Sequence, residues 1–84
     1  MPFFTYAIVS KERFRYIGHT SDLERRLEKH NTGKSHATKH GYEWRYIYAK
    51  EFTTRSEAMK HEKWLKSGVG RIWLTKNIAG WSPP

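Results

Sequence analysis

The chain has 84 residues, and its 16 Lys and Arg against 8 Asp and Glu give a formal net charge of +8. This length accommodates one small core, which excludes a second domain, so we expect a single domain over residues 1–84 with a frayed tail at 82–84. The absence of cysteine excludes disulfides, thiolate metal sites and a thiol nucleophile. No apolar run approaches the roughly 20 residues of a membrane helix, and we expect a cytoplasmic protein without membrane association. The positive charge favours a polyanionic partner, with nucleic acid as the leading class.

Two runs of aromatic and β-branched residues open the chain. Phe3–Val9 and Phe14–Gly18 flank a polar, turn-compatible segment at residues 10–13. This pattern predicts a β-hairpin. Because strand side chains alternate between faces, Tyr6 and Tyr16 can share one face if the strands pair in that register.

Two capping boxes mark helix starts further along the chain. Ser21–Glu24 has the pattern Ser-x-x-Glu and predicts a helix that stops at residues 31–33, while Thr54–Glu57 predicts a second helix through Lys66. Gly68 lies beyond the end of that helix, and residues 71–76 predict a last short helix or turn.

The segment between the helices divides into a loop and a strand. Lys34–Gly41 is polar and lacks periodicity, so it is predicted to be a loop. Tyr42–Phe52 has alternating aromatic residues, which predicts a third strand with one aromatic face made of Trp44, Tyr46 and Tyr48. The order β-β-α-β-α with a further short helix predicts an α+β fold, in which helices flank a three-stranded antiparallel sheet.

Several short motifs occur in a fixed order along these elements. They are Thr5-Tyr6-Ala7-Ile8, Tyr16-Ile17-Gly18, a helix with Arg26 and His30 one turn apart, and a later helix with Glu62. In order and spacing this set resembles the GIY-YIG nuclease family, over about residues 4–66. The match includes an intact second motif, whereas the first motif is Phe4-Thr5-Tyr6 and lacks the family's Gly and Ile.

The resemblance implies a metal-dependent endonuclease that hydrolyses phosphodiester bonds in DNA, with DNA repair or recombination as its process. Catalytic roles fall on Tyr6, Tyr16, Arg26, His30 and Glu62, and Glu62 is the expected ligand of Mg²⁺ or Mn²⁺. Arg26 offers a fork of donors to phosphate oxygens. Tyr6 is the candidate general base or water-orienting group, provided that nearby cations lower its pKa from about 10. Tyr16 would hydrogen-bond the water or a phosphate oxygen, and His30 would reach the same phosphate as Arg26 or relay a proton.

The same residues also have simpler interpretations. Tyr6 and Tyr16 in isolation would be packed strand aromatics, Glu62 an exposed partner of Lys66, and His30 a charge favoured at a helix C-terminus. At the level of function, the alternative to an enzyme is a non-catalytic, basic nucleic-acid-binding module. A third possibility is a structural or partner-binding domain whose charge merely aids solubility.

The expected partner is branched, nicked, single-stranded or duplex DNA, bound by a monomer or weak dimer. Some relatives in the family carry separate DNA-binding domains. We expect none in this chain, and we therefore expect structure-directed or weakly sequence-specific cleavage. Sequence-independent affinity comes mainly from side chains that neutralise phosphates. Eight such candidates stand outside the motifs: Lys34, His36, Lys39, His40, Arg45, Lys60, Lys63 and Arg71.

Overall fold

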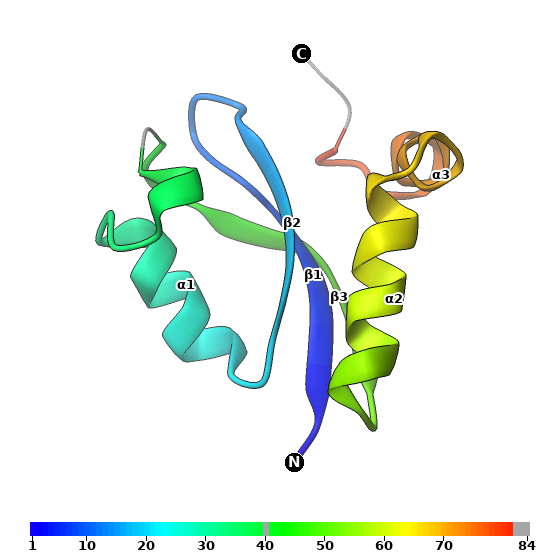
Figure 1. The fold of residues 1–84 in the computed structure, drawn as a ribbon. Coiled ribbons are helices and arrows are strands. Elements are labelled where there is room, and N and C mark those ends of the chain that lie inside the picture. The colour runs from blue at the N-terminus through cyan, green and yellow to red at the C-terminus, as the bar shows by residue number, and fades with distance from the viewer. Residues whose placement is uncertain (40, 82–84) are drawn as a thin grey trace.

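The computed structural model describes residues 1–39 and 41–81 and contains an antiparallel sheet flanked by helices (Figure 1). This arrangement confirms the predicted α+β class. Its elements, in chain order, are β1 (Phe3–Val9), β2 (Arg15–Thr20), α1 (Leu23–Asn31), the 3-10 helix η1 (His36–Thr38), β3 (Arg45–Phe52), α2 (Arg55–Lys66) and α3 (Gly68–Asn77). Among the described residues, no helix combines the length and apolar character needed to cross a bilayer.

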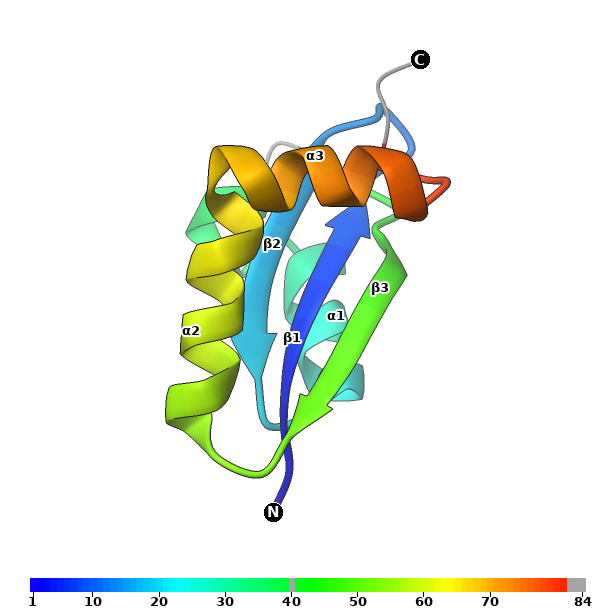
Figure 2. The same cartoon turned by 90° about the vertical axis from the view of Figure 1, so that its right-hand side faces the viewer.

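The strand order is β2-β1-β3, so β1 is the central strand and pairs on both sides. Helix α1 covers one face of the sheet, while α2 and α3 cover the other, with α3 lying across one end (Figures 1 and 2). Each face has its own core. Tyr6, Ile8 and Trp44 are buried towards α1, and a second buried cluster faces α2 and α3, consisting of Ala7, Ile17, Leu65, Leu74 and Trp81.

A β-bulge in the β1–β3 pair overturns the predicted single aromatic face of the third strand. Ala7 pairs with Tyr48, but the next residue, Ile8, pairs with Tyr46, so one residue of β3 is inserted between them. The extra residue reverses the alternation of side chains. Tyr46 therefore packs in the cluster beneath α1, whereas Tyr48 packs in the cluster beneath α2 and α3.

The helix starts differ in part from those predicted. The capping box at Thr54 is present, with the Thr54 side chain accepting from the Glu57 N–H and the Glu57 side chain accepting from the Thr54 N–H. In α1, however, the N-cap is Asp22 rather than Ser21, because the Asp22 carboxylate accepts from the Arg25 N–H. A carboxylate is at least as good a cap as a hydroxyl, and its negative charge also interacts favourably with the positive N-terminal end of the helix dipole.

Two further boundaries also differ. Strand β3 begins at Arg45 rather than Tyr42, because Glu43 has φ 55°, a left-handed conformation that interrupts an extended chain. Helix α3 begins at Gly68 and is longer than the predicted turn at residues 71–76. The cause is Ser67, whose hydroxyl caps α3 by accepting from the Gly70 N–H directly after α2 has ended.

Candidate active site

The hydroxyl of Tyr6 is the centre of a buried polar cluster between β1 and α1. It lies 2.8 Å from Nε2 of His30, and it accepts a hydrogen bond of 3.1 Å from Nε of Arg26. Arg26 and His30 stand one turn apart on α1 and thus face the sheet together. Tyr6 points towards α1 from the central strand, and it is completely buried.

His30 is completely buried, and its other ring nitrogen is also engaged. Nδ1 lies 2.6 Å from the hydroxyl of Thr38, a buried residue of η1. Burial, together with the positive charge of Arg26, lowers the pKa of His30 to about 4. His30 is therefore neutral near pH 7. A buried, neutral ring does not fit a charge favoured by the helix C-terminus, and it has no exposed edge in the protein alone, so the catalytic role of His30 stays a prediction.

The pKa of Tyr6 moves in the direction opposite to the one its predicted role requires. Burial raises the pKa to about 12, and the hydrogen bond and charge of Arg26 oppose this rise without cancelling it. The desolvation cost of a phenolate in the sheet interior outweighs one nearby cation. Tyr6 is therefore a neutral phenol in the protein alone.

Tyr16 and Gly18 form the part of the site on the edge strand β2. The strands pair in a register that places Tyr6 and Tyr16 on one face, because Tyr6 pairs with Gly18 and the two ring centroids lie 6.3 Å apart. A β-carbon on Gly18 would lie 2.7 Å from the Tyr6 hydroxyl oxygen and 2.8 Å from Cε2 of Tyr16. Any side chain at residue 18 would thus force the two tyrosines to move.

Glu62 lies on α2, beside the same edge strand, and both of its carboxylate oxygens are engaged. Oε1 lies 2.5 Å from Nδ1 of His19 on β2, and Oε2 accepts from Nζ of Lys66 at 2.6 Å. Burial alone would raise the pKa of the Glu62 carboxyl, but the hydrogen bonds from Lys66 and His19 hold that pKa below its ordinary value. The expected contact with Lys66 is present, yet the Glu62 side chain is only 18% exposed.

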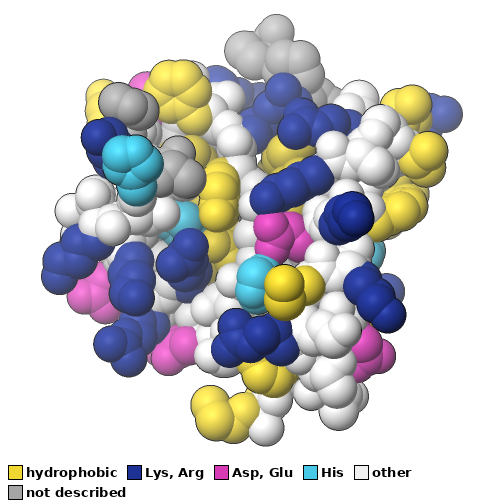
Figure 3. Space-filling model, in the orientation of Figure 1, with side chains coloured by type: hydrophobic (Ala, Val, Ile, Leu, Met, Phe, Trp, Pro, Cys, Tyr) yellow, Lys and Arg dark blue, Asp and Glu magenta, His cyan; other side chains and the backbone are white. Residues whose placement is uncertain are grey.

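The carboxylate and the tyrosines belong to one continuous site. Nζ of Lys66 lies 6.0 Å from the centre of the Tyr16 ring, and the charge of Glu62 is close enough to raise the pKa of Tyr6. Figure 3 shows acidic, histidine and basic side chains meeting in the middle of the face between α1 and α2. The site therefore straddles the edge strand β2, with Arg26 on one side and Glu62 on the other.

The side chains around Glu62 fit a weakly held divalent cation. Within residues 1–39 and 41–81, no three His, Cys, Asp or Glu side chains converge as a complete metal cage. Mg²⁺, however, is held in many phosphate-processing sites by one or two carboxylates together with waters and substrate phosphates. An ionised carboxylate such as Glu62 is a suitable hard ligand, with His19 as a neighbouring nitrogen donor. Lys66 is half-exposed and able to withdraw from Oε2.

Three polar residues of this site had no catalytic role in the sequence interpretation. Thr38 lies in a segment without periodicity, so nothing in the pattern connects it with His30. His19 follows Tyr16-Ile17-Gly18 directly, and strand alternation places it on the face opposite Tyr16, towards α2. Lys66 is detectable from its i, i+4 spacing to Glu62, but its proximity to Tyr16 depends on the packing of α2.

The predicted phosphate-contacting residues are distributed over several surfaces. Arg71 lines a cavity together with Tyr16 and Lys66, so it borders the site. Lys60 and Lys63 share a groove on α2 with Met59, and Lys34 lines a separate small pocket with Lys29. Three more candidates are exposed near η1 or at the start of β3: His36, Lys39 and Arg45. His40 lies outside the described residues.

The sequence as a whole matches the model of the GIY-YIG catalytic domain over residues 2–76. The chain belongs to the GIY-YIG family. This is a family of nucleases that generally use divalent metals. The assignment confirms the resemblance that the motifs indicate.

Similar proteins include several of the UPF0213 group. The UPF0213 protein YsiG of Lactococcus lactis is 35% identical over 79 residues, which cover 89% of this chain and 76% of that protein. The UPF0213 protein SAG0778 of Streptococcus agalactiae is 32% identical over 76 residues, which cover 89% of this chain and 86% of that protein. Among solved structures, the solution NMR structure of the UPF0213 protein BH0048 from Bacillus halodurans has a TM-score of 0.54 and 29% identity. The match covers 90% of this chain and 84% of that one.

Proposed function

We propose that this GIY-YIG protein is a divalent-metal-dependent endonuclease that hydrolyses phosphodiester bonds in DNA, with structure-directed or weak sequence specificity. The observation that carries the proposal is the position of two groups on either side of β2. One is the hydrogen-bonded cluster of Tyr6, Arg26 and His30, and the other is the ionised carboxylate of Glu62. Weak specificity agrees with a site surrounded by Lys and Arg, which neutralise phosphates without reading bases.

In this proposal, Tyr6 orients the attacking water and does not act as the general base. The pKa values of about 12 for Tyr6 and about 4 for His30 make a full proton transfer between them strongly uphill. A phenol has one donor and two acceptor positions. We infer that Tyr6 donates to Nε2 of His30 and accepts from Arg26, which leaves one lone pair to accept a hydrogen bond from water.

The proton arrangement of His30 then follows from its neutrality. A neutral imidazole has one N–H donor and one acceptor nitrogen. If Nε2 accepts from Tyr6, Nδ1 carries the proton and donates to the Thr38 hydroxyl. Thr38 is thus the residue that holds the ring in the tautomer that accepts from Tyr6.

Arg26 and Tyr16 act on the phosphate. Arg26 donates one N–H to Tyr6. The same residue also lines the cavity beside α1, where a phosphate can approach. A planar guanidinium stabilises the charge that builds up on phosphoryl oxygens. The half-buried Tyr16 lies between Arg26 and Lys66 and would hydrogen-bond a phosphate oxygen or the water.

Glu62 would hold the metal, with Mg²⁺ or Mn²⁺ as the expected ion. When bound, such an ion would stabilise the negative charge that develops on the phosphate and on the leaving 3′ oxygen. Hydrogen bonds from His19 and Lys66 keep the carboxylate ionised and oriented towards the edge strand.

The decisive assay incubates the purified chain with supercoiled plasmid and with single-stranded, nicked and branched DNA, in Mg²⁺ or Mn²⁺ and in EDTA. The proposal predicts cleavage in at least one metal-containing sample and none in EDTA. It also predicts that Glu62→Ala and Arg26→Ala cut far more slowly than the wild type. Intact DNA throughout, or variants that cut as well as the wild type, would sink it.

Two observations favour a non-catalytic nucleic-acid-binding module as the second candidate. Both oxygens of Glu62 already have protein partners, and Tyr6 is a neutral phenol of raised pKa. Such a module would bind DNA in a salt-sensitive manner without cutting it, and its affinity would not depend on Glu62. The assay above separates the two candidates.

A further inference from the structure

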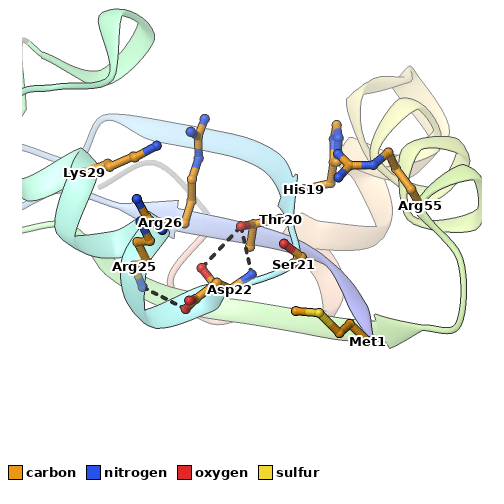
Figure 4. A pocket seen from close by; sticks show the side chains of 9 residues that line it. All are labelled: Met1, His19, Thr20, Ser21, Asp22, Arg25, Arg26, Lys29 and Arg55. Carbon is orange, nitrogen blue, oxygen red and sulfur yellow. Dashed lines mark hydrogen bonds between the residues drawn. The ribbon is translucent and has the colours of Figure 1, made fainter.

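A basic cavity of about 640 Å³ lies next to the candidate active site. Most of the cations that line it have no role in the mechanism described above. It opens where β2 ends and where α1 and α2 begin (Figure 4). Its charged lining consists of Arg25, Arg26 and Lys29 from α1, Arg55 from α2, and the acidic Asp22. This volume is within the range of pockets that bind drug-sized ligands.

The cations of the cavity lack anionic partners in the described part of the chain. No ion pair there involves Arg25, Lys29 or Arg55. Asp22 is occupied as the N-cap of α1, since its carboxylate accepts from the Arg25 N–H at 3.0 Å. Neighbouring positive charges repel one another and together create a strong positive potential in a concave site. The cavity therefore favours a negatively charged ligand.

The chemistry of the side chains that line the cavity indicates which class of anion it binds. Within the described residues, only one N–H group in the first turn of each helix has a side-chain acceptor, that of Arg25 at Asp22 and that of Glu57 at Thr54. The cavity is lined instead by charged side chains of both helices. Binding would come from guanidinium and ammonium groups, which suit phosphates. Arg55 is held in place, because its guanidinium lies 4.9 Å from the centre of the Phe3 ring.

The cavity is continuous with the candidate active site at two residues. Arg26 lines the cavity and also donates to Tyr6. His19 lines the cavity from the other side and contacts Glu62. A strand with one phosphate between Arg26 and Glu62 would thus place its next phosphates among Arg25, Lys29 and Arg55.

We propose that this cavity binds the backbone phosphates of the DNA strand that flank the scissile phosphate on one side. The proposal rests on the function proposed above for the choice of DNA as the ligand. It assigns a strand-binding role to Arg25, Lys29 and Arg55, which belong to neither the motifs nor the predicted phosphate contacts.

The test compares two double variants with the same loss of charge. Arg25→Gln/Lys29→Gln removes two of the three cations that α1 contributes to the cavity and leaves Arg26 in place. The control, Lys50→Gln/Lys76→Gln, removes two exposed cations from the opposite edge strand β3 and from the last turn of α3. Circular dichroism first verifies that both variants are folded. Fluorescence anisotropy of labelled single-stranded and duplex oligonucleotides is then measured in EDTA over a series of salt concentrations, so that binding is read without cleavage.

Each lost phosphate contact lowers the magnitude of the salt slope by about 0.7 to 0.9. We expect the cavity variant to lose about 1.4 to 1.8 from the slope and at least tenfold in affinity at low salt, with Arg55→Gln alone losing about half as much slope. The control should lose less than threefold in affinity and keep its slope. Equal losses in the two double variants would overturn the cavity proposal, even in a protein that cuts DNA. A cavity-specific loss in a protein that never cuts DNA would support the cavity and contradict the nuclease.

Discussion

Nε2 of His30 and the hydroxyl oxygen of Tyr6 lie 2.8 Å apart, although 24 residues separate them in the chain. The contact joins α1 to the central strand inside the core, where both side chains are buried in the protein alone. A buried polar contact is specific because its partners have no alternative in solvent, and losing one partner leaves the other unsatisfied. The position and protonation of Tyr6 therefore depend on His30, and the ring of His30 depends on Thr38.

Replacing the Thr38 hydroxyl tests this dependence. Thr38→Val keeps the shape but removes the acceptor for His30 Nδ1, whereas Thr38→Ser keeps the hydroxyl as a matched control. We expect Thr38→Val to lose about 1 to 3 kcal/mol in free energy of unfolding, and Thr38→Ser to lose clearly less. Nitrogen NMR of the imidazole should show a proton on Nδ1 in the wild type and a mixture of tautomers in Thr38→Val. A proton on Nε2 in the wild type would contradict the assigned direction of the Tyr6 hydrogen bond.

The lowered pKa of His30 predicts acid sensitivity. The unfolded chain takes up a proton on His30 near pH 6.5, whereas the folded protein does so only near pH 4. The unfolded state thus binds more protons in that window, so the free energy of unfolding falls as pH drops from about 6.5 to 4, by up to about 3 kcal/mol. Urea unfolding at a series of pH values measures this. His30→Gln should remove most of the slope in that window, while the exposed His36→Gln should retain it.

Gly18 should tolerate no side chain, because a β-carbon there meets both Tyr6 and Tyr16. We expect Gly18→Ala to destabilise the fold by about 1 to 3 kcal/mol and to reduce DNA cleavage by at least about tenfold, since the tyrosines must shift. Gly68→Ala is the control, because a β-carbon at residue 68 has no heavy atom within 4 Å. Thermal unfolding and cleavage rates of the two variants give the comparison. Equal behaviour would show that the contact at Gly18 is relieved without cost.

Lys66 should compete with the metal for Glu62, because its ammonium donates to Oε2 at 2.6 Å. Lys66→Gln should therefore lower the Mn²⁺ concentration that gives half-maximal cleavage by a few-fold, without requiring a faster maximal rate. Lys63→Gln, one turn earlier on α2 and exposed, serves as the control for lost positive charge. An unchanged or higher metal requirement in Lys66→Gln would show that Lys66 does not shield the carboxylate.

Much of the fold follows from local patterns in the sequence. The hairpin of the first two strands and the capping box at Thr54 depend on residues close in the chain, and both are present. The opposite orientations of Tyr46 and Tyr48 were not predictable, because they result from a bulge whose cause lies in the packing of β3 against β1 and both helix layers. Alternation alone carries no sign of an inserted residue.

The candidate site was likewise predictable from the sequence only in part. The motifs indicate which side chains lie near Tyr6, but they do not indicate how deeply those side chains are buried. The raised pKa of Tyr6 and the lowered pKa of His30 both arise from desolvation, a property of the assembled core. Similarly, the contact between His19 and Glu62 joins residues 43 positions apart. Such a contact is absent from any local pattern.

The most direct test of the proposed activity compares the cleavage rates of the wild type, Glu62→Gln and Glu51→Gln on supercoiled plasmid in Mn²⁺. Both substitutions replace a carboxylate by an amide, but Glu51 is an exposed residue of β3. If Glu62 holds the metal, Glu62→Gln should cut at least about a hundredfold more slowly, as expected when a group that stabilises the transition state is lost. Glu51→Gln should match the wild type. Glu62→Gln cleaving at the rate of Glu51→Gln would contradict a metal-dependent nuclease centred on Glu62.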